Sequence, residues 1–220
     1  MITGLANPDG RRWLLALHSS SDSLGVGLQC LGATQPERLE SFPLGRSLSN
    51  GLFDCLESVL PASAWPQLGR LAVATGPGGF TGTRLTVVLA RTLAQQLALP
   101  LDGISSFHLM ARRLLAGPRP PSAAGPFWLL QELPRRGVVA GLYGADPGLP
   151  GGVVELEAPR LHRGRDALAP FPIHPAEVRL PEDVIQLLGF SAASAAAGLS
   201  APWQPVLPLY PTSPVEALPC

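Results

Sequence analysis

The chain has 220 residues, of which 46% are hydrophobic and 15% are charged, and its formal net charge is zero. This length and composition predict a globular protein with a substantial core. The zero net charge argues against a non-specific nucleic-acid clamp, which needs a basic excess to displace counterions. An unusually apolar surface for this size favours a protein partner that covers part of it.

The basic residues are all arginines, sixteen in number, and lysine is absent. The chain therefore cannot form a Schiff base, use a lysine as general base or hold a phosphate with a Walker-type lysine. The three cysteines, Cys30, Cys55 and Cys220, form no CxxC pair, which indicates a reducing compartment and no zinc site. No apolar run is long enough to span a bilayer, and Met1–Arg12 does not have the pattern of a signal peptide. We therefore expect a cytoplasmic protein without membrane contact.

The first part of the chain predicts a mixed sheet with antiparallel strands leading. Strand patterns occur in three segments: Trp13–Leu17, Ser23–Leu31 and Glu37–Pro43. A helix capped by Ser47 or Ser49 should follow, and Pro61 should end it. Its apolar side chains recur at three- and four-residue spacing and include Leu48, Leu52, Cys55, Leu56 and Val59.

A glycine-rich turn then joins a buried strand, Gly69–Thr75, to a long helix, Thr83–Ala98. The turn itself reads Gly76-Pro77-Gly78-Gly79-Phe80-Thr81-Gly82. A short strand, Pro100–Asp102, follows the helix. Ser105 or Ser106 should cap a third helix that ends near Ala116.

The segment Gly117–Pro126 is rich in Pro, Gly, Ala and Ser and predicts a junction between two lobes. Beyond it, further strands are predicted at Phe127–Leu133, Gly137–Tyr143 and Val153–Leu156. Short helices are expected at Pro181–Leu188 and Ser191–Gly198, with Glu182 and Asp183 near the positive end of the first. The proline-dense stretch Pro202–Pro219 should run extended over the surface.

The glycine-rich turn is compatible with several functions. A P-loop needs a lysine after its last glycine, and here Thr83 and Arg84 follow Gly82. A dinucleotide-binding turn fits the glycine spacing better, because a helix follows and Asp102 lies where an acid contacts a ribose. Against that function, Pro77 removes one N–H from the turn. The remaining alternative is a sharp strand–helix connection that binds no ligand.

Four segments resemble the TsaB (YeaZ) family. Ala72–Arg84 is similar to the family's Gly-Pro-Gly-Ser-Phe-Thr-Gly-x-Arg signature, and Ala98–Ser106 is similar to its Gly-Leu-Pro-Leu-x-Gly-Val-Ser-Ser run. Leu15–Ser20 resembles the family's opening Leu-Ala-Ile-Asp-Thr-Ser, and Pro208–Val215 resembles its Pro-x-Tyr-x-Arg-x-Pro tail. The match is specific between Gly69 and Ser106.

The resemblance implies an actin-like ATPase (ribonuclease H-like) α/β fold, with two lobes that each hold a mixed sheet flanked by helices. It implies an N-terminal extension (1–12), a first lobe (13–106), an inter-lobe helix and linker (107–126) and a diverged second lobe with a proline-rich tail (127–220). The implied function is that of a non-catalytic scaffold and activator in the synthesis of threonylcarbamoyladenosine at position 37 of bacterial tRNAs. A nucleotide- or dinucleotide-dependent enzyme that uses the glycine-rich turn is the alternative.

The implied partners are a TsaD-like catalytic paralogue and a TsaE-like ATPase, with a homodimer possible for the isolated chain and tRNA contacted only indirectly. The chain would bind no cofactor or metal by itself, and ATP would be used by the partner subunits. It would contribute no catalytic residue of its own.

The chain also departs from the family pattern. His18 stands where the family has an acid that helps to hold metal and phosphates, which argues against phosphoryl transfer. Leu48-Ser49 replaces a frequent His-Ser at the start of the first helix. In the second lobe, Leu133–Ala140 keeps only the arginines and one valine of the family's Asp-Ala-Arg-Arg-x-Glu-Val-Tyr.

We predict that the partner binds to the outward parts of the first two helices. On the second helix, leucines at four-residue spacing should face the sheet: Leu85, Leu89, Leu93 and Leu97. A neighbouring stripe of small residues should admit another helix: Thr83, Val87, Ala90 and Ala94. The predicted interface residues are Leu52, Leu56, Thr83, Arg84, Val87 and Arg91. A charge at Val87 should then break the complex and leave the fold intact.

The histidines show no metal-ligand spacing. His162, which lies among Arg160, Arg163 and Arg165, is interpreted as part of a solvated loop, with contact to a tRNA backbone as the alternative. Arg135 and Arg136 have the same two interpretations. The serines after His18 are interpreted as a turn rather than as a nucleophile.

Overall fold

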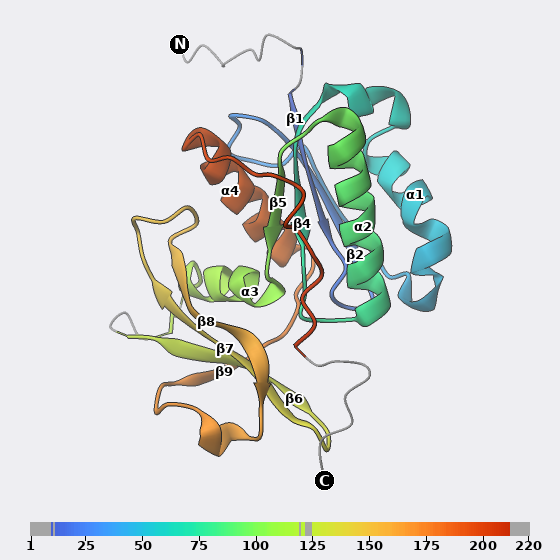
Figure 1. Ribbon diagram of the computed structural model, residues 1–220. Helices are drawn as coiled ribbons and strands as arrows, with labels where there is room; N and C mark the ends of the chain where they lie inside the picture. The colour runs from blue at the N-terminus through green and yellow to red at the C-terminus, as the bar shows by residue number, and fades with distance from the viewer. Residues whose placement is uncertain (1–9, 11, 119, 122–124, 212–220) are drawn as a thin grey trace.

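The computed structural model describes residues 10, 12–118, 120–121 and 125–211, and it contains two sheets flanked by helices (Figure 1). The strands of the first sheet are β1 (Trp13–His18), β2 (Leu24–Cys30), β3 (Arg38–Phe42), β4 (Leu68–Ala74) and β5 (Leu101–Ile104). Their order is β3-β2-β1-β4-β5. The first three strands pair antiparallel, as predicted, whereas β4 and β5 run parallel to β1.

The second sheet consists of β6 (Phe127–Leu133), β7 (Gly137–Ala145), β8 (Val153–His162) and β9 (Ile173–Pro175). Its order, β8-β7-β6-β9, repeats the order of the first four strands, and β9 is again parallel to the strand that opens the sheet. The predicted α/β fold of the actin-like ATPase (ribonuclease H-like) class is therefore confirmed. Strand β8 is longer than predicted, and β9 was not predicted because it has only three residues.

The helices are α1 (Leu48–Val59), α2 (Phe80–Leu97), α3 (Ser106–Leu115) and α4 (Glu182–Ala196), with short 3-10 segments at Gly45–Ser47, Ala62–Gln67 and Arg165–Ala167. Ser105 caps α3 as predicted, because its side chain accepts a hydrogen bond from the N–H of His108. The predicted serine cap of α1 is wrong, since the side chain of Ser47 makes no capping bond. Helix α4 is continuous where two short helices were predicted.

Both faces of the first sheet are buried. Leu15 and Leu17 of β1 pack in one cluster with α1 and α2, whereas Leu14 and Ala16 pack in a second cluster with α4. This alternation follows from the two-residue period of a strand. The sheet therefore lies between α1 and α2 on one side and α4 on the other.

Each of the last two helices packs on the sheet that does not directly precede it in the chain. Helix α3 packs on β7 and β8 of the second sheet, whereas α4 packs on β1, β2 and β4 of the first (Figure 1). Gly25 and Gly27 let α4 approach β2 closely, because a Cβ at either position would lie within 2.7 Å of Val184. A second lobe defined as residues 127–220 therefore does not describe the packing, since α4 covers the first sheet.

The segment after α4 runs extended along the free edge of β5. The N–H of Leu101 donates to the carbonyl of Ala201, and the N–H of Leu209 donates to the carbonyl of Thr75. The side chain of Val206 is buried in the first cluster. This segment protects an edge strand that would otherwise present unpaired backbone groups.

Candidate functional site

The glycine-rich turn packs directly on the turn between β1 and β2. The N–H of Gly79 donates to the carbonyl of Ser20 at 2.9 Å. A Cβ at Gly78 would lie 2.2 Å from that same carbonyl oxygen, and a Cβ at Gly82 would lie 2.6 Å from the carbonyl oxygen of Ser19. These two glycines therefore allow a close backbone approach within the chain itself.

The hydroxyl groups around the turn also bond to one another. The Oγ of Ser19 lies 2.7 Å from the Oγ1 of Thr86, and the Oγ of Ser20 lies 2.7 Å from the Oγ of Ser106. The N–H of Ser106 donates to the carbonyl of Gly76. The four side chains are buried. A nucleophilic role for Ser19 or Ser20 is disfavoured, because both hydroxyls already have a partner other than a base.

His18 lies at the end of β1 beneath this turn and is fully buried. Its Nδ1 accepts a weak hydrogen bond from the N–H of Ser20, and its Nε2 has no partner. Burial, together with the nearby Arg113 guanidinium, lowers the pKa of His18 to about 4. The ring is therefore neutral at physiological pH, and it supplies none of the negative charge that an acid at this position would offer a metal–phosphate group.

The dinucleotide alternative fails at Asp102. Its carboxylate is bound by the guanidinium of Arg70 through two hydrogen bonds of 2.7 and 2.9 Å. Ser191 of α4 donates a third hydrogen bond to it. Because the Asp102 side chain is only 9% exposed and already has these partners, it cannot contact a ribose.

Exchange of Gly78 for alanine tests how tightly the two turns fit. The added Cβ would collide with backbone atoms of Ser20, which cannot rotate away, so we expect a loss of about 1–3 kcal/mol in the free energy of unfolding. Gly79→Ala is the matched control, because the nearest atom to a Cβ there is 3.8 Å away. Urea unfolding measures both variants. Equal stability of the two would contradict the close packing described here.

Four of the six predicted interface residues lie in the interior. Leu52, Leu56, Val87 and Thr83 are each no more than 4% exposed, and the first three belong to the core cluster between the sheet and helices α1 and α2. The prediction that these side chains face outward is wrong. On α2 the small-residue stripe faces the sheet and the leucines flank it, because small side chains let the helix lie close to the strands.

Arg91 is also used within the chain. Its guanidinium donates to the carbonyls of Gln204 and Val206 and lies over the ring of Trp203. It therefore anchors the segment along β5. Of the predicted interface residues, Arg84 alone is exposed.

The outward face of α2 carries a stripe at four-residue spacing, of which Arg84 alone was predicted as an interface residue. This stripe, called the outer stripe, consists of Phe80, Arg84, Val88 and Thr92, all of which are exposed. Phe53 lies on the exposed side of the neighbouring helix α1. At the start of the stripe, the ring of Phe80 packs on Tyr210 with centroids 4.7 Å apart. Large apolar side chains at exposed positions are the feature that distinguishes this surface.

Comparison with known proteins shows what this part of the chain is similar to. The family model for TsaD, tRNA N6-adenosine threonylcarbamoyltransferase, matches residues 46–127, which include the glycine-rich turn and helices α1 to α3. The tRNA threonylcarbamoyladenosine biosynthesis protein TsaB of Bacillus subtilis is 32% identical over 100 residues, which are 44% of this chain and 43% of that protein. The chain is similar to TsaB over this part and spans less than half of the length of that relative.

Two solved structures from Pseudomonas aeruginosa have the same fold as this chain. A protein described as similar to the peptidase YEAZ has a TM-score of 0.70 at 20% identity and covers 91% of this chain and 100% of its own. YeaZ itself has a TM-score of 0.66 at 19% identity, with 90% and 99% covered. The likeness of fold thus extends over the second lobe of this chain, beyond residue 127 where the family match ends.

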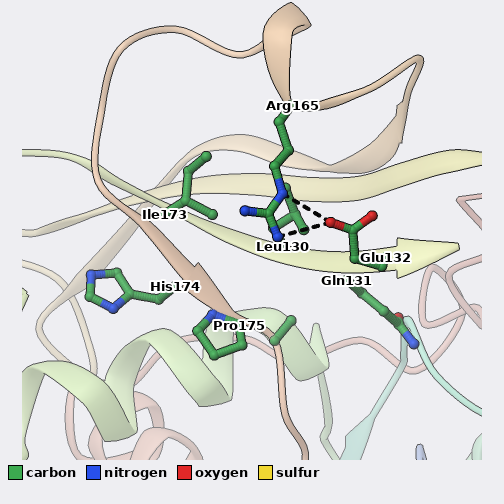
Figure 2. A pocket seen from close by; sticks show the side chains of 8 residues that line it. Leu130, Gln131, Glu132, Arg165, Ile173, His174 and Pro175 are labelled. Atoms are coloured by element: carbon green, nitrogen blue, oxygen red, sulfur yellow. Dashed lines mark hydrogen bonds and ion pairs between the residues drawn. The ribbon is translucent and has the colours of Figure 1, made fainter.

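A hollow of about 450 Å³ lies in that second lobe, beside β6 and β9 (Figure 2). Its lining includes Leu130, Gln131, Ile173, His174 and Pro175. Figure 2 shows the ion pair between Arg165 and Glu132 beside it, and both of these side chains are largely exposed.

Within the described ranges, no group of three or more His, Cys, Asp or Glu side chains is placed to bind a metal ion. Among the same residues, no helix combines the length and the apolar character needed to cross a membrane.

Proposed function

We propose that this chain is a non-catalytic scaffold and activator subunit of the machinery that makes N6-threonylcarbamoyladenosine at position 37 of bacterial tRNAs. In this proposal it pairs with a TsaD-like catalytic paralogue, and a TsaE-like ATPase joins the pair. The similarity to TsaB and to the TsaD family model supports the pathway. The work on tRNA would place the chain in the cytoplasm.

The filled glycine-rich turn is the observation that carries the non-catalytic part of the proposal. In phosphate-binding turns, backbone N–H groups point at the ligand and glycines leave room for it. Here the room beside Gly78 and Gly82 is taken by the backbone of Ser19 and Ser20. The neutral His18 adds no metal-binding charge. We therefore propose that ATP is used by the partner subunits and that this chain binds no cofactor alone.

The outer stripe of α2, together with Phe53 of α1, is the surface that we propose for the TsaD-like partner. Val88 and Phe53 are 52% and 53% exposed, which is unusual for large apolar side chains on adjacent helices and favours burial in a complex. Arg84 lies between Phe80 and Val88 and offers a cation for pairing. We expect the same surface to support a homodimer when the chain is alone.

A charge at Val88 tests this surface. We expect Val88→Asp to weaken the complex with the TsaD-like protein of the same cell at least tenfold, because a carboxylate would be buried in an apolar interface, a loss of about 1.4 kcal/mol or more. Co-purification followed by size-exclusion chromatography measures the complex. Leu156→Asp is the matched control, since Leu156 of β8 is 51% exposed but lies on the other lobe.

The outcomes separate the surface from the function. A stable one-to-one complex that Val88→Asp disrupts and Leu156→Asp preserves would support the whole proposal. Unchanged co-elution of Val88→Asp would remove α2 from the interface. Absence of any complex, with or without a TsaE-like protein and ATP, would overturn the scaffold function.

A further inference from the structure

Five of the sixteen arginines gather at one end of the second sheet, and they come from separate parts of the chain. Together they are called the arginine tip: Arg135, Arg136, Arg160, Arg163 and Arg165. The first two occupy the turn between β6 and β7, at the lower end of the second lobe in Figure 1. Arg160 lies near the end of β8, Arg163 directly follows the strand, and Arg165 begins the next 3-10 segment.

Strand register brings these arginines together. Val138 of β7 pairs with His162 of β8, and Ala140 pairs with Arg160. Gly137 lies so close to β8 that a Cβ there would meet the carbonyl oxygens of His162 and Arg163. His162 itself points inward and packs on Trp128, so the interpretation of this histidine as part of a solvated loop is wrong. The arginines around it stay on the surface.

The arginine tip carries more positive than negative charge in a chain whose net charge is zero. All five arginines are exposed. Arg165 pairs with Glu132 and Arg160 pairs with Glu157, and Asp166 lies in the same segment. Within the part of the chain that the structure describes, the side chains of Arg135, Arg136 and Arg163 form no hydrogen bond or ion pair. Exposed ion pairs such as Arg165–Glu132 contribute little to stability. The guanidinium groups of Arg160 and Arg165 can therefore exchange their carboxylate partners for another anion.

The hollow beside Arg165 adds a second element (Figure 2). Leu130, Ile173 and Pro175 supply apolar lining, whereas Gln131 and His174 supply an amide and an imidazole. Unpaired bases of RNA are recognised by stacking on aromatic or guanidinium groups and by hydrogen bonds to their edges. A cluster of exposed guanidinium groups next to such a hollow fits an RNA, because RNA presents unpaired bases beside its phosphates.

We propose that the arginine tip binds the phosphate backbone of RNA directly. Guanidinium groups match phosphate oxygens in bidentate geometry. The identity of the RNA as the tRNA substrate rests on the proposed function. Residues of this chain would then contact tRNA directly, in place of the indirect contact expected from the sequence.

The test compares two triple charge reversals. Arg135→Glu, Arg136→Glu and Arg163→Glu are combined in the tip variant, whereas Arg12→Glu, Arg38→Glu and Arg179→Glu form the control at exposed positions elsewhere. Fluorescence anisotropy measures the binding of a labelled tRNA transcript to each protein over a series of salt concentrations. The full chain is used both alone and with its TsaD-like partner. Co-elution with that partner is measured on the same samples.

We expect the tip variant to bind tRNA at least tenfold more weakly than the control, and the slope of log K against log salt to fall by about two to three. Equal affinity and slope in the two variants would overturn the proposal. Selective loss of polyglutamate binding, with tRNA binding unchanged, would assign the tip to an acidic protein and overturn it as well. If no complex with the TsaD-like protein forms, the proposed function fails, whereas the isolated chain still tests the tip.

Discussion

Exchange of Asp102 for alanine is expected to lower the free energy of unfolding by about 3–5 kcal/mol, which is the usual cost of breaking a buried ion pair. The Arg70 and Asp102 side chains are 7% and 9% exposed and form two hydrogen bonds between neighbouring strands β4 and β5. Removal of the carboxylate leaves a buried guanidinium and the Ser191 hydroxyl without their acceptor. Urea unfolding followed by circular dichroism measures the loss.

Two controls show whether the loss comes from an unpaired charge. Glu132→Ala breaks the ion pair between Glu132 and Arg165, and these two side chains are 59% and 60% exposed. This change should lower the free energy of unfolding by at most about 1 kcal/mol. The double variant Arg70→Met with Asp102→Leu removes both charges and should be clearly more stable than Asp102→Ala alone. If Asp102→Ala were as stable as Glu132→Ala, the buried pair would not hold the strands as described.

Acidification from pH 7.5 to pH 4 should destabilise the fold through His18, which is buried, and His108, which is half-buried. Burial lowers the pKa of His18 and of His108 from 6.5 to about 4, and the nearby guanidinium groups of Arg113 and Arg112 add to the effect. Above pH 6.5 both rings are neutral in the folded and the unfolded chain. As pH falls from 6.5 to 4, the unfolded chain binds protons that the folded chain excludes, so stability falls by about 3 kcal/mol for each ring.

The His18→Leu, His108→Leu double variant isolates this effect. Burial raises the pKa of Asp183, although its contacts with Arg179 and Arg113 oppose the shift. Proton uptake by folded Asp183 therefore adds stability as pH falls, which opposes the histidine effect, in wild type and in the double variant alike. The difference in unfolding free energy between wild type and the double variant cancels that contribution. We expect this difference to change by several kcal/mol between pH 7.5 and pH 4, and a constant difference would contradict the burial of neutral histidines.

Local pattern was sufficient for most of the fold. The two-residue period of the first strands, the helical period of α1 and α2 and the glycine-rich turn each depend on neighbours within a few residues, and each was predicted near its observed position. The two-lobed arrangement was predicted from the family resemblance. The residues that carry this resemblance lie in the strand–turn–helix unit around the glycine-rich turn. The packing of α3 on the second sheet and of α4 on the first depends on contacts between residues distant in sequence. The spacing of apolar residues within one helix does not reveal such contacts.

The candidate site shows the same division. The sequence placed a partner surface on α1 and α2 but chose the side of α2 that carries Thr83 and Val87, because apolar spacing alone does not say which of two adjacent stripes lies closer to the sheet. Packing decides it: small residues minimise the distance between helix and strands, so that stripe is buried and the outer stripe of Phe80, Arg84, Val88 and Thr92 remains free.

The sequence by itself determined the α/β class, the strand–turn–helix unit around Gly76–Gly82 and the absence of lysine chemistry, since all three follow from residue type and local order. Only the tertiary structure decided what the turn does and where charge gathers. The carbonyl of Ser20 fills the turn, Arg70 takes the carboxylate of Asp102, and strand register assembles the arginine tip from residues up to thirty positions apart. These are long-range contacts, and their partners are selected by packing rather than by any pattern along the chain.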